Sequence, residues 1–259
     1  TGMPALNKQM AQDGARDAGR TGYLITLHMP SYLGVMDHCT DRDLRREVYT
    51  AFITRASDAG PGEGQFDNTA VMREILRLRR EMAALLGFEH YAELSIARKM
   101  AADAAEVQAF INQLVEQCLP VARQDIEALE SYARETLGIV MLQPWDLRFV
   151  SERVRQAHYD VSQEALRPYF PIETVLAGMF EIVARLYGIA IQATEAPDTW
   201  HRDVTFYEVR RDGQLLGQFY LDPFARAHKR GGAWMAECRI RRRRHHHLQL
   251  PVAFLTCNF

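Results

Sequence analysis

The sequence predicts a mainly α-helical fold with a small antiparallel β-sheet near its C-terminal end. Apolar residues recur at helical spacing from about residue 40 to residue 187, and after Gly188 they alternate as in strands. The Asp212-Gly213 pair, between two β-prone runs, is a strong hairpin signal. These observations divide the chain into a helical region, residues 1–200, and a β-hairpin region, residues 201–259.

The first predicted helices begin at residues that commonly cap helix N-termini. One spans about residues 40–56 and starts with Thr-Asp-Arg-Asp. The hydroxyl and carboxyl groups of this start can accept hydrogen bonds from the free N–H groups of the first turn. A second begins at Asp67 or Asn68, carries its apolar residues on one stripe, and ends at Gly87.

Two longer helical stretches follow. Asp103 caps a stretch that runs to about Leu137, and Pro120 makes it either two helices or one kinked helix because proline cannot donate to the helical ladder. Residues 172–187 form a helix that is apolar over a wide face, so we expect it to be deeply buried.

The predicted sheet begins with the hairpin. Residues 204–209 and 215–221 are its two strands, and the segment Leu248–Asn258 adds a further strand. The final residues, Leu255–Phe259, have the pattern of a buried strand, which predicts that the chain is a truncated piece of a longer protein.

Composition excludes several classes of protein. The 47% hydrophobic and 25% charged fractions of these 259 residues are those of an ordinary globular protein. A net charge of -2 gives no global attraction for nucleic acid or an anionic membrane. No apolar run reaches the roughly 18 residues of a membrane span, and four scattered cysteines favour a reducing compartment. We therefore expect a cytoplasmic protein without nucleic-acid or membrane partners.

The histidines provide no recognisable metal site. A zinc-peptidase helix needs two histidines four residues apart and a glutamate directly after the first one. No isolated histidine is followed by glutamate, so we interpret them as structural or surface residues: His28, His38, His90, His158, His201 and His228. No residue of this sequence is predicted to be catalytic or to bind a metal.

A basic tract, Arg239–His247, contains five arginines and three consecutive histidines. It could form a metal clip or a patch for a polyanion. Adjacent side chains on a strand point to opposite faces, which disfavours the clip. We interpret the tract as a solvated loop tip between two strands.

The segment Gly231-Gly232-Ala233-Trp234 is the one candidate binding element. Two glycines let another backbone approach closely, so the segment could be an edge strand that pairs with an extended peptide. A side chain at Gly232 would then obstruct the peptide. Alternatively the glycines supply positive φ in a turn, and Trp234 belongs to the core.

Eight short strings, in the same order along nearly the whole chain, resemble the oligopeptidase A and thimet oligopeptidase family of zinc metallopeptidases. They are Tyr23–Leu27, Thr54–Asp58, Leu85–Tyr91, Leu142–Asp146, Leu166–Pro171, Gly217–Asp222, Lys229–Met235 and Pro251–Phe259. The departure from the family lies in Arg239–His247, where relatives have a mixed polar hairpin.

The resemblance implies a largely helical fold with a deep channel that admits short peptides, which a zinc-activated water hydrolyses. Residues 1–200 would form channel wall. The zinc helix of the family lies beyond the strand matched by Leu255–Phe259, so no catalytic residue is carried over. We expect zinc in the complete enzyme and none in this chain, which should be inactive alone. The alternative is a non-catalytic helical peptide-binding or protein-interaction module, and the sequence beyond Phe259 would distinguish the two.

Overall fold

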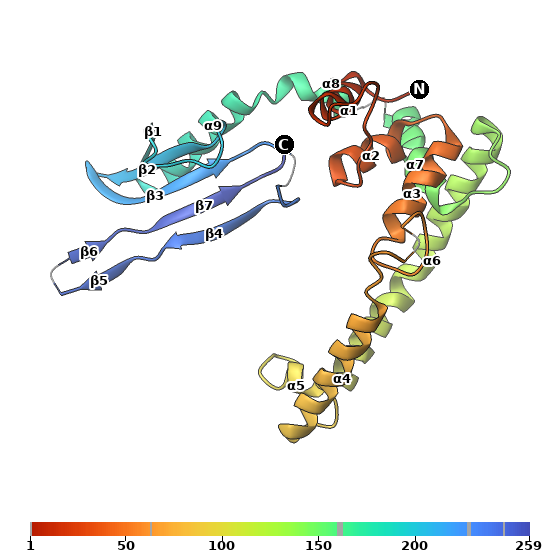
Figure 1. Ribbon diagram of the computed structural model, residues 1–259, viewed down its shortest axis with the longest axis horizontal. Coiled ribbons are helices and arrows are strands. Elements are labelled where there is room, and N and C mark those ends of the chain that lie inside the picture. The colour runs from red at the N-terminus through yellow and green to blue at the C-terminus, as the bar shows by residue number, and fades with distance from the viewer. Residues whose placement is uncertain (1, 63, 160–162, 227–228, 246) are drawn as a thin grey trace. The chain divides into compact units, whose positions relative to one another are not determined.

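The computed structural model describes residues 2–62, 64–159, 163–226, 229–245 and 247–259. The chain forms two compact units, residues 1–161 and residues 162–259. Their elements are coloured from red to blue along the chain in Figure 1. Within the described ranges, no helix is both long enough and apolar enough to cross a membrane.

The first unit is helical throughout. Its helices are α1 (Ala5–Asp17), α2 (Met29–His38), α3 (Arg42–Ile53), α4 (Thr69–Leu85), α5 (Tyr91–Ile96), α6 (Ala104–Leu137) and α7 (Pro144–Tyr159).

Hydrogen bonds confirm the predicted starts of α3 and α6, whereas α3 ends at Ile53 and not at about residue 56 as predicted. The Asp41 carboxylate accepts hydrogen bonds from two backbone N–H groups in the first turn of α3, and Asp103 accepts one from Glu106 in α6. Gly138 ends α6 with a φ of 66°, a conformation that glycine adopts without steric cost. Pro120 lies inside α6, so the stretch that the sequence left open is one helix.

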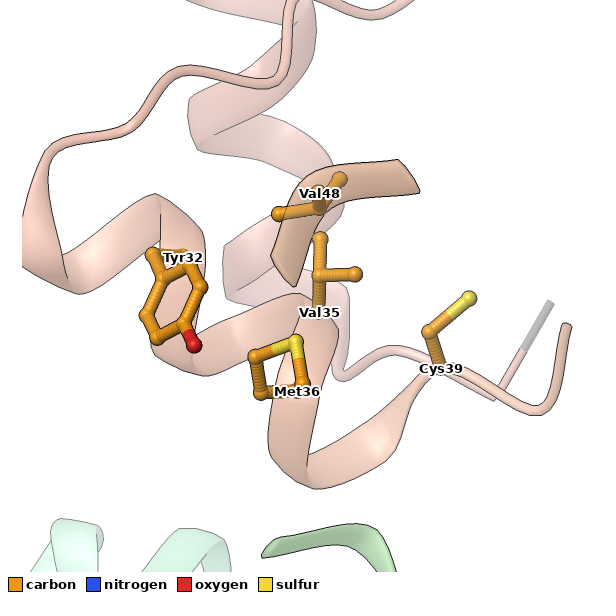
Figure 2. Close-up of a cluster of buried hydrophobic side chains, with 5 residues drawn as sticks. All are labelled: Tyr32, Val35, Met36, Cys39 and Val48. Atoms are coloured by element: carbon orange, nitrogen blue, oxygen red, sulfur yellow. The ribbon is translucent and has the colours of Figure 1, made fainter. Parts of the chain in front are cut away.

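The main core of the first unit lies between α2 and α3. Its buried side chains, drawn in Figure 2, are Tyr32, Val35, Met36, Cys39 and Val48. Tyr32 stacks on Phe52 of α3 with ring centroids 4.0 Å apart. Removal of these apolar side chains from water stabilises the pair of helices.

A buried ion cluster joins α3 to the start of α7. Asp146 is fully buried and accepts hydrogen bonds from Arg42 at 2.7 Å and from Arg45 at 2.7 Å. Arg45 is 1% exposed, also donates to the Cys39 carbonyl, and lies over the Phe149 ring. Burial alone would raise the pKa of Asp146, but the hydrogen bonds from the two arginines hold it below the ordinary value.

The second unit places one long helix against a sheet. It contains α8 (Gln163–Leu166), the 3₁₀ turn η1 (Arg167–Tyr169), α9 (Ile172–Tyr187), β1 (Ala190–Thr194), β2 (Thr205–Arg211), β3 (Gln214–Asp222), β4 (Trp234–Arg239), β5 (Arg242–Arg244), β6 (His247–Gln249) and β7 (Val252–Thr256). The strand order of the larger sheet is β1-β2-β3-β7-β4, and β5 and β6 form a separate pair.

The hairpin between β2 and β3 confirms the clearest local prediction. Asp212 and Gly213 both have positive φ, 48° and 77°, as the tight turn requires. The mainly α fold with a small C-terminal sheet is also confirmed. The sheet is mixed, however, and not antiparallel as predicted, because β3 pairs with β7 in parallel. The long connection between them, which contains β4, allows that crossover.

The prediction that the helix at residues 172–187 is deeply buried is wrong for the described structure. Phe180 of α9 packs edge-on against Tyr207 and Phe219 of the sheet. Other apolar side chains of α9 are exposed, among them Ile182 and Leu186. Only one face of the helix meets the sheet, so a wide apolar stripe does not by itself guarantee burial.

We predict that Asp146→Ala destabilises the first unit by about 3–5 kcal/mol, because it leaves Arg45 buried without its counterion. Chemical denaturation followed by circular dichroism measures this. Asp13→Ala removes an exposed ion pair with Arg16 and should cost less than about 0.5 kcal/mol. Equal losses in the two variants would contradict a special role for the buried cluster.

Candidate functional site

The candidate segment Gly231–Trp234 leads directly into an edge strand. Within the described residues β4 pairs only with β7, which leaves the backbone groups on its other side unpaired. Gly231, Gly232 and Ala233 are exposed, and Trp234 is half-buried beside Arg230. We call the outer side of Gly231–Arg239 the β4 edge.

The two glycines of this segment differ in conformation. Gly232 has a φ of 95°, in the left-handed region, whereas Gly231 does not. A Cβ at either position would meet no atom within 4 Å. Gly232 therefore makes a turn, and β4, which is mostly exposed, begins two residues later at Trp234.

A side chain of the neighbouring C-terminal segment fixes this turn. The Asn258 amide donates hydrogen bonds to the carbonyls of Arg230 and Gly232. The backbone N–H of Cys257 donates to the Asp222 carbonyl at 2.8 Å, which ties the same segment to the end of β3. The turn before β4 is thus held by β3 and by the residues after β7.

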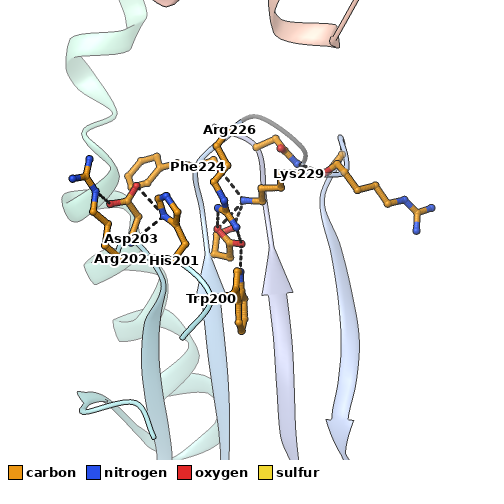
Figure 3. Close-up of polar contacts among 11 residues, drawn as sticks. Trp200, His201, Arg202, Asp203, Phe224, Arg226 and Lys229 are labelled. Carbon is orange, nitrogen blue, oxygen red and sulfur yellow. Dashed lines mark hydrogen bonds and ion pairs between the residues drawn. The ribbon is translucent and has the colours of Figure 1, made fainter. Parts of the chain in front are cut away.

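The carboxylate of Asp222, at the end of β3, organises the loop that precedes the turn. It accepts hydrogen bonds from the side chains of Trp200, Arg226 and Lys229, which are labelled in Figure 3. Arg226 donates to both carboxylate oxygens at 2.6 and 2.7 Å, Lys229 donates to one at 2.9 Å, and the Trp200 indole N–H donates at 3.0 Å. Lys229 also donates to the carbonyls of Asp222 and Phe224.

The electrostatics of this cluster follow from its burial and its charges. The side chain of Asp222 is 3% exposed and that of Lys229 is 4% exposed. The hydrogen bond from Arg226 lowers the pKa of Asp222 most, burial opposes it, and bonds from Lys229 and Trp200 lower it further, to well below the ordinary value. Asp222 is therefore a permanent anion at neutral pH that clamps two cations.

A cavity of about 500 Å³ lies against one face of the sheet and is bordered by β4. The aromatic rings of Phe206 and Tyr220 line it, together with Glu208, Gln218 and Arg239. Glu208 is already held by hydrogen bonds from Arg210 and Gln218. The volume suits a small ligand or several side chains of a peptide.

The described residues do not fit a zinc ion. Among them, no three His, Cys, Asp or Glu side chains converge as a metal site requires. His201 and Asp203 lie 3.5 Å apart, but they are only two donors (Figure 3). His246 of the basic tract and His228 lie outside the described residues. No catalytic step is assigned to a metal held by this chain.

Comparison with known proteins defines the family. The sequence profile of Peptidase family M3 matches residues 35–259.

The chain belongs to peptidase family M3.

Its family M3 relatives include oligopeptidase A of Haemophilus influenzae, 46% identical over 260 residues that cover the whole chain and 38% of that relative. Oligopeptidase A of Escherichia coli is 47% identical over 262 residues, again 38% of its length. Dipeptidyl carboxypeptidase of Escherichia coli is 31% identical over 266 residues. The chain therefore spans well under half of these relatives.

Sequence reasoning proposed the Gly231–Trp234 segment, which stays a prediction, and missed the Asp222 cluster. Asp222 and Lys229 both lie in strings that resemble the family, yet nothing in those strings indicates that they meet. The spacing could have indicated the cluster, because Arg226 and Lys229 follow a strand-end aspartate within seven residues. If these two cations are buried, their two positive charges need a counterion.

We predict that Asp222→Asn lowers the free energy of unfolding at pH 7 by about 3 kcal/mol, because Lys229 loses its buried counterion. The folded pKa is depressed, so the stabilisation is complete above the unfolded value of about 3.9 and is lost as pH falls toward the folded pKa. The difference between the wild type and Asp222→Asn should therefore be constant from about pH 5 to 8 and shrink below about pH 4.

Urea denaturation at several pH values measures this difference. Asp198→Asn is the matched control because Asp198 is exposed. A difference for Asp222→Asn that stays unchanged down to about pH 2 would contradict the clamp.

Proposed function

We propose that this chain is part of a zinc metallopeptidase that hydrolyses short peptides, and that its β4 edge binds the peptide backbone. The observation that carries the proposal is the free edge of β4 directly after Gly231 and Gly232. The identity to oligopeptidase A of two bacteria supports peptides as the substrate class. The four unpaired cysteines support the reducing environment of the cytoplasm.

An extended peptide would add to β4 as a further strand. Alternate residues of an edge strand offer their N–H and C=O groups outward, so each bound residue pair gains backbone hydrogen bonds irrespective of its side chain. Such pairing fixes the peptide at a defined distance from the hydrolytic centre and reduces the entropy lost on reaction. The absence of side chains at Gly231 and Gly232 permits the close approach.

The hydrolytic chemistry itself is not assigned to described residues. The family resemblance implies zinc, but the described side chains provide no three-ligand set. We therefore propose that residues 1–200 act as channel wall, that residues 201–259 provide the substrate edge, and that these 259 residues alone are inactive.

The position that best tests the edge is Gly231. Its φ is outside the left-handed region, so Gly231→Val adds bulk without backbone strain. In a peptidase of the relatives' length that carries this sequence, we expect Gly231→Val to lower kcat/KM for peptides about tenfold or more, because it obstructs backbone pairing. The melting temperature should not change. Steady-state kinetics and thermal unfolding are the measurements.

Gly232→Val is the comparison variant. Its φ of 95° strains any residue with a Cβ, so this variant should also destabilise folding by about 1 kcal/mol or more. Full peptidase activity in a normally folded Gly231→Val variant would remove the β4 edge from substrate binding.

We also expect the isolated 259-residue chain to hydrolyse no peptide and to hold less than one zinc per chain, because the required ligands do not converge. Metal analysis and a fluorogenic peptide assay test this. Tight zinc with chelator-sensitive turnover would overturn the expectation. A weak zinc signal that disappears on replacement of residues 245–247 would assign metal binding to the basic tract.

A further inference from the structure

The β4 edge continues into a strongly basic strand pair. Arg239 ends β4, Arg241 lies between β4 and β5, and Arg242–Arg244 form β5; we call these five arginines the basic ribbon. Every one of them is exposed. Across from them, β6 offers the neutral side chains of Leu248 and Gln249, with Arg243 opposite Leu248 and Arg242 opposite Gln249.

The arginines of the basic ribbon have no acidic partner among the described residues. None of the ion pairs found there, at up to 4.0 Å, includes any of the five. Three other cations of the same unit are paired with acids, since Arg210 binds Glu208, and Arg226 and Lys229 bind Asp222. A guanidinium group is always charged at physiological pH, so five uncompensated charges are concentrated on one narrow surface.

The basic ribbon is collinear with the proposed substrate edge. In Figure 1, β4 and β5 follow one another along one side of a long strand pair, while β6 and β7 form the other side. A hydrogen bond of 2.9 Å from Gln249 to the Ile240 carbonyl closes the junction between the two parts. The free side of β4 therefore leads to the free side of β5, and residues 234–244 span roughly 33 Å at the usual strand rise.

We propose that the basic ribbon selects peptides with acidic residues, which lie beside β5 while the rest of the extended peptide pairs with β4. This inference rests on the proposed function and names its substrate class. Alternate side chains of an extended peptide are about 7 Å apart, which matches the spacing of Arg242 and Arg244 on one face of β5. Carboxylates at alternate positions can therefore meet successive guanidinium groups.

A peptide fits this surface better than a nucleic acid does. Single-stranded nucleic acids bind where aromatic rings stack on bases between basic residues. Residues 239–249 include no Phe, Tyr or Trp. The adjoining feature is a free backbone edge, whose alternating N–H and C=O groups match those of an extended peptide, whereas a phosphate backbone can use only the N–H donors.

The test uses the 259-residue chain and fluorescence anisotropy with labelled peptides of about twelve residues, long enough to reach from β4 to β5. One peptide is neutral, and two others carry a run of glutamates at the N-terminal or the C-terminal end. The test variant combines Arg242→Gln, Arg243→Gln and Arg244→Gln. The control combines Arg20→Gln, Arg98→Gln and Arg123→Gln, which removes the same charge from exposed positions in the first unit.

We expect one of the acidic peptides to bind about tenfold more tightly than the neutral peptide in about 50 mM salt, as several exposed ion pairs together allow. The test variant should lose most of that advantage, as should the wild type in about 300 mM salt. The control should keep the advantage. Circular dichroism of each variant verifies that the fold is retained.

Three results would overturn the inference. They are equal affinity for neutral and acidic peptides, an acidic preference that survives the test variant, and an oligothymidylate of similar charge that binds more tightly than the acidic peptides. The same assay tests the proposed function separately. If the β4 edge does not bind the peptide backbone, Gly231→Val leaves the affinity for the neutral peptide unchanged. An arginine-dependent acidic preference in that case would still support the basic ribbon.

Discussion

The buried carboxylate of Asp222 is the interaction on which the second unit and its candidate site depend. An ionised carboxylate is costly to bury unless donors surround it. Here Arg226, Lys229 and Trp200 supply them, all from outside the strand that carries Asp222. Because Arg226 and Lys229 belong to the connection between β3 and β4, their contacts with Asp222 hold two residues that precede Gly231.

The first unit also contains a buried aspartate whose charge is neutralised by neighbouring cations. Asp146 is buried at the start of α7, and Arg42 and Arg45 of α3 neutralise it. Asp146 joins elements about 100 residues apart, whereas the cations on Asp222 lie within seven residues of it, and in both units the cations donate to the carboxylate at hydrogen-bonding distance. Such clusters contribute less net stability than their number of contacts suggests, but loss of one partner is costly, which makes the geometry specific.

The edge position of β4 links the fold to the proposed peptide binding. A sheet edge is a hazard in a soluble protein because it pairs readily with other strands. The exposed arginines that follow β4 counter unspecific pairing by repulsion between like-charged edges, while they leave the edge available to a partner of opposite charge. Under the proposal made above, the same arginines would limit aggregation and favour acidic peptides.

The sequence alone determined the local elements and the family. Helix caps such as Asp41 and Asp103, the Asp212-Gly213 turn and the collinear family strings depend on neighbouring residues, so a linear reading finds them. How much of α9 is buried and the parallel pairing of β3 with β7 were decided by the tertiary structure, because both depend on which segments meet in space. The Asp222 cluster belongs to the same group, because burial turns an ordinary strand-end aspartate into a clamp only when Trp200 and Lys229 approach it in space.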